Sequence, residues 1–253
     1  FDLTSKDYIR RFPSLDLRCT LAAQGGYGRE ELNPHSDIDL LIVFDGRLSR
    51  SEEQFVNALL QPLWDLRLTI GHQIRELREL DDVDDGNPEF LLALVDARLV
   101  AGDERVFDAA QARFPHRDSS HARSLLTSLL SLTDERHAAF NSTFYQLEPD
   151  IKEAPSGLRD ISAVRWIQEL AGDDWHSASP LDLDQLKESE DFLLQIRSIL
   201  HVEYGRNKNV LSHKLQERVA DVLEFDGETP QQRVESLMRE YFRRARTVAR
   251  RHL

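Results

Sequence analysis

The chain contains 253 residues, 40% of them hydrophobic, and carries a formal net charge of −13 at pH 7. That length suffices for one large or two modest domains with a real core, and the acidic excess argues against a large DNA- or RNA-binding face. The single cysteine excludes an intrachain disulfide, and no apolar run approaches the roughly 20 residues that cross a bilayer, so we expect a soluble cytoplasmic protein without membrane contact.

The first part of the chain predicts two strands joined by a glycine-rich turn. Residues 16–24, DLRCTLAAQ, are apolar enough for a buried strand, and the sequence GGYGREELNPHS after them predicts a turn. Residues 37–44, DIDLLIVF, alternate acidic and aliphatic side chains before becoming wholly apolar. This pattern is typical of a central strand with one functional end.

A helix and a third strand are predicted next. Ser49 precedes Glu52 by three residues, the spacing of a capping box, and an amphipathic helix is expected up to about Leu68. Its apolar stripe consists of Phe55, Leu59, Leu63 and Leu66. Residues 68–76, LTIGHQIRE, alternate again and predict a strand.

The rest of the chain is predicted to be mostly helical. From about Asp81 onward the periodicity is that of helices, apart from a possible short strand at ARLVAG, and the loop QLEPDIKEAPSGLRD interrupts it. Thr229 and Pro230 form an N-cap and first-turn pair for a last helix, and Gly205 is placed to close the helix before it. We therefore predict an α+β chain: a small mixed-sheet domain in residues 1–115, then an all-α helical bundle domain in residues 116–253 that completes the cleft.

The sequence Ser36-Asp37-Ile38-Asp39 points to chemistry. Residues two apart on a strand project to the same side, so Asp37 and Asp39 would present their carboxylates together. Adjacent carboxylates repel each other, and a bound divalent cation removes that cost. Oxygen ligands favour Mg²⁺, which takes one or two protein carboxylates and completes its shell with water and substrate phosphates. The alternative is a solvated strand end or a capping pair.

Gly25 and Gly26 precede this motif. Without side chains they let the backbone approach a polyphosphate and donate N–H groups to it, and Arg29 could add charge. A metal next to a phosphate cradle favours in-line displacement at phosphorus, which is nucleotidyl transfer. Taken alone, the glycines would predict only a turn. The dinucleotide and P-loop fingerprints are absent, since GGYGRE is not GxGxxG and no GK[ST] occurs.

The segment GGYGREELNPHSDIDLLIVF resembles the signature of the polymerase-beta-type nucleotidyltransferase superfamily, in the version found in PII-protein uridylyltransferases. WDLRLTIGHQIREL is similar to the next strand of that family, LEPDIKEAPSGLRDI to its second motif and REYFRRARTVAR to its closing helix, so the resemblance covers nearly the whole chain. Glutamine synthetase adenylyltransferases share the superfamily, but the tryptophan-to-histidine stretch resembles the uridylyltransferases more closely.

The resemblance implies roles for individual residues. The residues expected to bind the metal and carry catalysis are Asp37 and Asp39. The residues expected to bind the nucleotide are Gly25, Gly26, Arg29, Ser36, Lys152, Arg159 and Asp160. For the last three, bracing of the motif loop is an alternative, and Arg159 and Asp160 could simply cap the following helix.

Two positions depart from the family pattern, and one expected acid is missing. Glu30 stands where the family usually has glycine after the arginine, and Ser156 replaces the first glycine of the second motif. The wider superfamily often uses a third carboxylate on a neighbouring strand, but TIGHQIR contains none. Glu76 is the nearest acid in sequence, and His72 or Gln73 could face the site instead. His72 could equally be a half-buried strand residue with a hydrogen-bonded ring.

The resemblance implies transfer of UMP from UTP to a tyrosine hydroxyl of a PII-like nitrogen-regulatory protein, with Mg²⁺ bound and pyrophosphate released. The residues themselves do not distinguish uracil from adenine, so adenylyl transfer by the same fold stays an alternative, as does a catalytically silent regulatory or interaction module. The first residues lack an initiator methionine and the last are basic without a helix stop signal, from which we expect a piece of a longer multifunctional enzyme.

Overall fold

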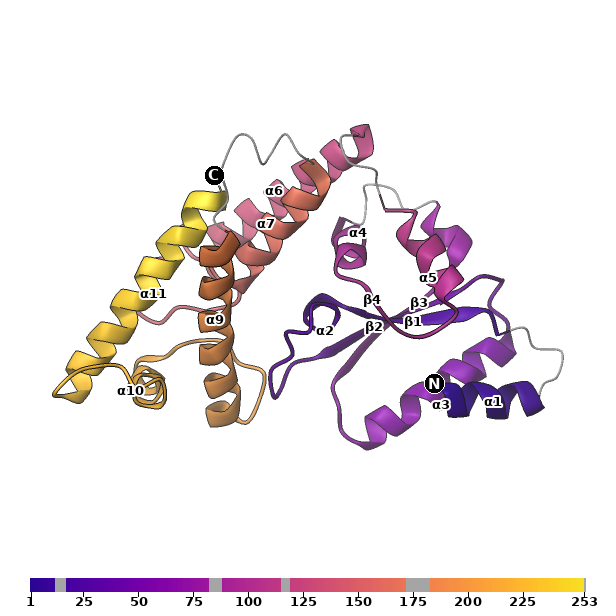
Figure 1. The fold of residues 1–253 in the computed structure, drawn as a ribbon, viewed down its shortest axis with the longest axis horizontal. Helices are drawn as coiled ribbons and strands as arrows, with labels where there is room; N and C mark the ends of the chain where they lie inside the picture. Colours follow the sequence, from indigo (N-terminus) through magenta and orange to yellow (C-terminus); the bar gives the residue numbers. More distant parts are fainter. Residues whose placement is uncertain (12–16, 82–87, 115–118, 172–182, 253) are drawn as a thin grey trace. The chain divides into compact units, whose positions relative to one another are not determined.

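The computed structural model describes residues 1–11, 17–81, 88–114, 119–171 and 183–252, and the chain divides into two compact units (Figure 1). The first unit comprises residues 1–32 and 36–115, and the second comprises residues 33–35 and 116–253. The expected domain boundary between residues 115 and 116 lies outside the described residues. No helix in the described ranges is long and apolar enough to cross a membrane.

A four-stranded sheet with strand order β3-β2-β1-β4 forms the centre of the first unit. Its strands are β1 (Cys19–Gln24), β2 (Ile38–Phe44), β3 (Ile70–Glu76) and β4 (Arg98–Gly102). β1 pairs antiparallel with β2 and with β4, whereas β2 pairs in parallel with β3. The predicted α+β class with a small mixed sheet is therefore confirmed, and so is the short strand within ARLVAG.

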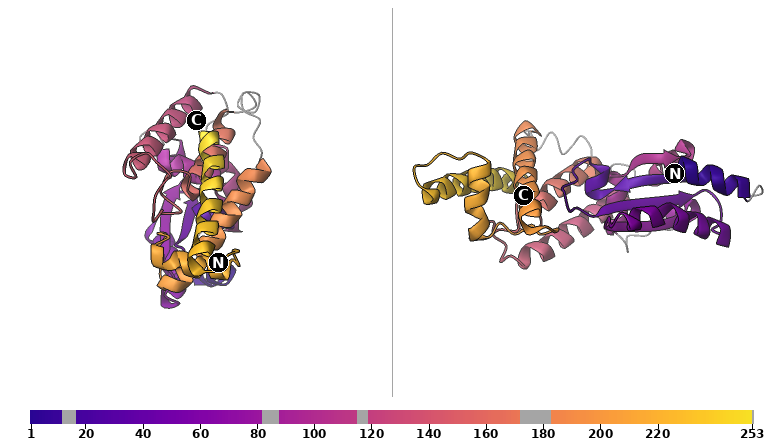
Figure 2. Two further views of the ribbon diagram at one scale, coloured as in Figure 1. Left: turned by 90° about the vertical axis from the view of Figure 1, so that its left-hand side faces the viewer. Right: turned by 90° about the horizontal axis from the view of Figure 1, so that it is seen from below.

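Helices cover both faces of this sheet (Figures 1 and 2). On one face lie α1 (Asp2–Arg11) and α3 (Arg50–Asp65), and Phe55 of α3 is buried in one core with Leu40 and Ile42 of β2. On the other face lie α4 (Pro88–Val95) and α5 (Glu104–Gln111), and the Arg75 guanidinium of β3 lies over the Phe90 ring of α4. The 3-10 helix η1 (Leu77–Leu80) follows β3. Neither α1 nor η1 was predicted from the sequence.

The helix α3 begins as predicted and ends earlier. Ser49 Oγ accepts the Ser51 N–H at 3.2 Å, and Glu52 Oε2 accepts the Ser49 N–H at 3.0 Å, which completes the capping box. The prediction that Leu66 belongs to the apolar stripe was wrong, because the helix stops at Asp65 and Leu66 is 71% exposed. Arg67 takes a left-handed conformation with φ 59°, which ends the helix. The buried positions are Phe55, Val56, Leu59 and Leu60.

The glycine-rich turn predicted after β1 is in part a single helical turn, α2 (Gly25–Gly28). The carbonyl of Gly25 accepts the Arg29 N–H at 3.0 Å, and the carbonyl of Gly26 accepts the Glu31 N–H at 2.7 Å. Gly25 has a positive φ of 52°, a conformation in which a side chain is strained. The first glycine of the motif thus redirects the chain from strand to helix.

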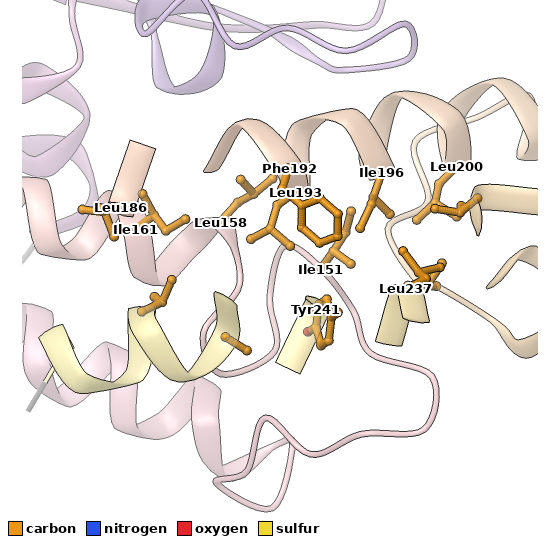
Figure 3. Close-up of a cluster of buried hydrophobic side chains, with 14 of the residues drawn as sticks. Ile151, Leu158, Ile161, Leu186, Phe192, Leu193, Ile196, Leu200, Leu237 and Tyr241 are labelled. Atoms are coloured by element: carbon orange, nitrogen blue, oxygen red, sulfur yellow. The ribbon is translucent and has the colours of Figure 1, made fainter. Parts of the chain in front are cut away.

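The second unit is helical, and one buried core joins several of its helices (Figure 3). Its helices within the described residues are α6 (Ser120–Ala138), α7 (Leu158–Ala171), α9 (Leu183–Tyr204), α10 (His213–Val222) and α11 (Pro230–His252). Side chains of α7, α9 and α11 converge in the core, with Ile161, Ile196 and Tyr241 among the most buried. Both predicted helix signals are confirmed, since Gly205 has φ 63° and Thr229 Oγ1 accepts the Gln232 N–H at 3.3 Å.

Residues 33–35 belong to this second unit, where they contact a partly buried polar cluster on α9. Ser198 Oγ donates to Asn33 Oδ1 at 2.8 Å, and the His35 N–H donates to His201 Nδ1 at 3.3 Å. His201 is fully buried, and its Nε2 lies 3.2 Å from Asn209 Oδ1. Burial lowers the pKa of His201 and so favours its neutral form. Because Nδ1 accepts the His35 N–H, the proton of the neutral ring is on Nε2.

Candidate functional site

The carboxylate of Asp39 is exposed at the start of β2, between two glycines. In the sheet, Asp39 pairs with Gln24 of β1 and with Gly71 of β3. A Cβ atom placed on Gly25 would lie 3.5 Å from Asp39 Oδ2, and one placed on Gly71 would lie 2.5 Å from Oδ1. The fold therefore brings the carboxylate of Asp39 next to the first glycine of the GGYG motif, and these two features were expected from the sequence to act together.

Asp37 and Ser36 directly precede β2, with Asp37 exposed and Ser36 half-buried. The pairing with β3 starts immediately afterwards, because the Ile38 N–H donates to the Thr69 carbonyl at 2.9 Å. Ile38 packs with the core beneath α3. The described residues contain no group of three or more His, Cys, Asp or Glu arranged to hold a metal ion. Binding of a cation by Asp37 and Asp39 stays a prediction.

Arg29, expected to add charge beside a phosphate, is tied to two acids of the first unit. Its Nε donates to Glu31 Oε2 at 2.7 Å, and its Nη1 donates to Asp96 Oδ2. Burial opposes the charge on Arg29, but the two acids dominate and raise its pKa. In this arrangement the guanidinium holds the end of α2 against the segment before β4. A contact of Arg29 with phosphate stays a prediction.

The third glycine of the motif serves packing. A Cβ atom on Gly28 would lie 1.9 Å from the Asp96 carbonyl oxygen, so only glycine allows these two backbone segments to approach. Arg98 secures the same contact, because its Nε donates to the Gly28 carbonyl at 3.2 Å and its Nη2 donates to the Tyr27 carbonyl at 3.1 Å. Sequence reasoning missed Asp96 and Arg98, which lie far from the motif along the chain.

Both departures from the family's glycine pattern fall in left-handed backbone. Glu30 has φ 63° and Ser156 has φ 66°, a region that favours glycine. The side chain of Glu30 is mostly exposed and approaches Arg98 Nε at 3.5 Å. The loops therefore keep the conformation that glycine would give, at the cost of local strain.

The second motif is a tight loop that leads into α7. The Leu158 N–H donates to the Ile151 carbonyl and the Arg159 N–H to the Lys152 carbonyl, both at 3.0 Å. A Cβ atom on Gly157 would lie 2.8 Å from the Lys152 carbonyl oxygen, so this position also requires glycine. The helix begins at Leu158, which places Arg159 and Asp160 in its first turn.

Asp160 is buried beneath this loop, with 1% of its side chain exposed. Its Oδ1 accepts from Arg136 Nη2 at 2.5 Å and its Oδ2 accepts the Ser156 N–H at 2.6 Å. His137 Nε2 lies 2.9 Å from Oδ1 and donates to this carboxylate. These contacts are those of a residue that braces the loop, and contact of Asp160 with a nucleotide stays a prediction.

Lys152 and Arg159 are the more exposed cations of the motif. Lys152 Nζ lies 3.7 Å from Glu153 Oε1, and Arg159 Nε lies 3.5 Å from Glu153 Oε2. The loop thus brings both predicted nucleotide-binding cations to the carboxylate of Glu153, whereas Asp160 is buried and has other partners. The ion pairs of Lys152 and Arg159 are long and partly exposed to solvent, and surface pairs of this kind contribute little stability.

The strand β3 supplies no acid on the face that carries Asp39. Because side chains alternate along a strand, Gly71 and Gln73 share the face of Asp39, whereas His72 and Glu76 lie on the opposite face. The His72 ring packs edge-on to Trp64 at 5.9 Å. Glu76 accepts the Leu48 N–H at 2.8 Å, and this bond together with Arg78 lowers its pKa. Of the three substitutes considered for a third acid, only Gln73 is on the right face.

Two protein-family models match the chain. Residues 125–252 match the model described as GlnD PII-uridylyltransferase, and residues 6–87 match a nucleotidyltransferase domain. The first match covers half of the chain, and the second covers β1, α2, β2 and β3 with the GGYG and Asp37–Asp39 motifs.

Among curated proteins, the chain is 35% identical over 250 residues to the bifunctional uridylyltransferase/uridylyl-removing enzyme of Photobacterium profundum, covering 95% of this chain and 28% of that protein. It is 32% identical over 256 residues to the protein of the same description from Burkholderia vietnamiensis, covering 97% of this chain and 30% of the relative. The chain thus spans under a third of the length of these relatives. A crystal structure of a toxin–antitoxin with AMP-PNP matches 56% of the chain and 96% of its own chain at 12% identity, with a TM-score of 0.29.

Proposed function

Because the chain belongs to the PII-uridylyltransferase family, we propose that it carries out Mg²⁺-dependent transfer of UMP from UTP to a tyrosine hydroxyl of a PII-like nitrogen-regulatory protein, with release of pyrophosphate. The family matches support the type of reaction and the kind of acceptor. The structural observation behind the proposal is the exposed carboxylate of Asp39 beside Gly25.

The donor set at this edge of the sheet fits Mg²⁺. Asp37 and Asp39 offer oxygen ligands alone, and Mg²⁺ commonly takes one or two carboxylates and completes its octahedron with water and substrate phosphates. When bound, the cation would neutralise charge that develops on the phosphate oxygens during displacement. The two carboxylates would hold it next to Gly25, which has no side chain to obstruct a triphosphate.

The backbone of α2 would orient the nucleotide. The first N–H groups of a helical turn have no carbonyl partner within the helix and are available to phosphate oxygens. Gly25 and Gly26 keep that approach free of side chains. Arg29 would support this turn, because its bonds to Glu31 and Asp96 fix the end of α2. Precise positioning of this kind is the main contribution of a protein to phosphoryl-type transfer.

Label transfer from UTP to a PII-like protein tests the proposal. We expect Asp37→Asn and Asp39→Asn each to abolish transfer while the melting temperature stays within a few degrees of wild type, because both side chains are exposed. Asp108→Asn is a matched control: it makes the same chemical change at an exposed position of α5, and it should leave transfer intact. Transfer that persists in both site variants would overturn the metal assignment.

The nucleotide is tested separately by thermal shift with the four ribonucleoside triphosphates, each with and without Mg²⁺. A ligand that binds only the native state stabilises it by about 2.7 kcal/mol at a concentration of about 100 times Kd. We expect UTP with Mg²⁺ to give the largest shift. A larger shift with ATP would favour adenylyl transfer, and no shift with any nucleotide would favour a catalytically silent module, for which the absence of an acid on the Asp39 face of β3 is the supporting observation.

A further inference from the structure

Gly71 occupies an unusual position for a glycine, in the second place of a seven-residue strand. Glycine in a strand weakens it, since it has no side chain to pack, and often marks a place where a ligand or another group comes close. Here the group is the carboxylate of Asp39, which lies 2.5 Å from where a Cβ atom of Gly71 would be. This separation is far shorter than van der Waals contact. Any side chain at residue 71 would therefore force the Asp39 carboxylate to move from its present place.

A second glycine lies on the other side of the same carboxylate. Gly25 has a left-handed conformation with φ 52°, and its Cβ atom would be 3.5 Å from Asp39 Oδ2. That distance is ordinary contact. The carboxylate therefore lies between two backbone segments, one from α2 and one from β3. Only a side chain on β3, at position 71, would clash with it.

We infer that Gly71 is a positioning residue of the nucleotidyl-transfer site: by lacking a side chain, it lets the Asp39 carboxylate turn over the β3 backbone into the orientation that binds the cation. This inference rests on the proposed function. It also explains why β3 carries no acid on the face of Asp39. At Gly71 this strand provides space for the Asp39 carboxylate instead of a third acid. The site is then a two-carboxylate site, bounded on its third side by the Gly71 backbone.

Alanine at position 71 tests this inference with a minimal change. Its methyl group meets only the end of a flexible side chain, so the strand can form while the Asp39 carboxylate is displaced. A misplacement of about 1 Å near reacting groups can reduce a rate about 100-fold. We expect Gly71→Ala to lower label transfer by about that factor and to weaken Mn²⁺ binding, measured by electron paramagnetic resonance of the free ion in the presence of UTP.

Two controls separate this effect from a change in folding. Gly46→Ala replaces an exposed glycine with no atom within 4 Å of its Cβ position, and it should leave transfer and Mn²⁺ binding unchanged. The melting temperature of Gly71→Ala should equal or exceed that of wild type, because alanine is the better strand residue. A structural role alone would instead lower the melting temperature and leave the Mn²⁺ affinity of the folded protein unchanged.

The possible failures are distinguishable. If wild type transfers label and binds Mn²⁺ and Gly71→Ala does both equally well, the inference about Gly71 is overturned and the proposed function stands. If wild type binds no Mn²⁺ with any nucleotide and transfers no label, the proposed function fails and the role of Gly71 fails with it. A selective loss of cation affinity and transfer in Gly71→Ala, with a melting temperature no lower than that of wild type, supports the inference.

Discussion

Replacement of Asp160 by alanine should destabilise the second unit strongly. The carboxylate is 1% exposed, and its loss leaves the Ser156 N–H without its acceptor and the guanidinium of Arg136 without its counter-charge. Breaking a buried charge pair by removing one partner costs about 3–5 kcal/mol. For a domain of this size, about 2–4 °C of melting temperature corresponds to 1 kcal/mol, so we expect a decrease of roughly 6–20 °C.

The assay is thermal and urea denaturation of Asp160→Ala beside Arg159→Ala. Arg159 is the adjacent residue of the same helical turn, its side chain is 48% exposed, and its ion pair with Glu153 is 3.5 Å long. Such an exposed pair contributes about 0–1 kcal/mol, so this variant should unfold close to wild type. If Asp160→Ala kept the wild-type melting temperature and lost UTP-dependent stabilisation instead, the carboxylate would act on the ligand and the bracing role would be refuted.

Three further predictions concern strain, protonation and thiol chemistry. Glu30→Gly should raise the free energy of unfolding by about 1 kcal/mol. Left-handed backbone costs a residue with a side chain about 1–2 kcal/mol, and the greater entropy of glycine in the unfolded chain offsets part of this gain. An unchanged urea midpoint would contradict this prediction. The folded-state pKa of His201 lies below the 6.5 of the exposed group, mainly through burial, so the unfolded chain takes up the proton first and stability should fall as pH decreases below about 6.5. His201→Asn, whose amide oxygen can still accept the His35 N–H, should show a weaker fall between pH 7.5 and 5.5, and equal slopes would argue against His201 as the source. Burial raises the pKa of the Cys19 thiol to about 12, so Cys19 should react with a disulfide reagent at pH 8 only after unfolding, and fast labelling of the native protein would be inconsistent with the buried strand.

Some helix starts and ends that depend on a few neighbouring residues were predicted correctly from the sequence. The capping box of Ser49, the left-handed stop at Gly205 and the cap at Thr229 act within a few residues, and each appears in the structure as expected. Residues 37–44 predicted a strand because acids that alternate with aliphatic residues before a short apolar run are typical of a central strand buried on both faces beyond one end, and residues 40–44 are all buried. Helix α1 was missed. Leu66 was placed wrongly because an apolar residue directly after the helix end continues the spacing of the apolar stripe.

The arrangement around the candidate site depends on contacts that no local pattern encodes. Arg29 and Asp96 are 67 residues apart, and Arg136 and Asp160 are 24 residues apart. Which face of β3 carries a possible third ligand follows from the parallel register with β2, and a shift of one residue would exchange Gln73 for His72. The acids and glycines of the candidate site were therefore predicted from the sequence, whereas the salt bridges of Arg29 with Glu31 and Asp96 and the short distance between Gly71 and Asp39 required the structure.

The assignment of residues 33–35 to the helical unit has a practical consequence for dissecting this protein. A polypeptide starting at residue 116 would lack the partners that Asn33 and His35 give to Ser198 and to the buried ring of His201. Ser198 Oγ and His201 Nδ1 would then have to bond water or remain unsatisfied, and an unsatisfied group that stays buried is costly. Such a truncated chain should be less soluble and less cooperative in unfolding than its helices alone would suggest, and adding a peptide that spans residues 33–35 in trans is the direct way to restore it.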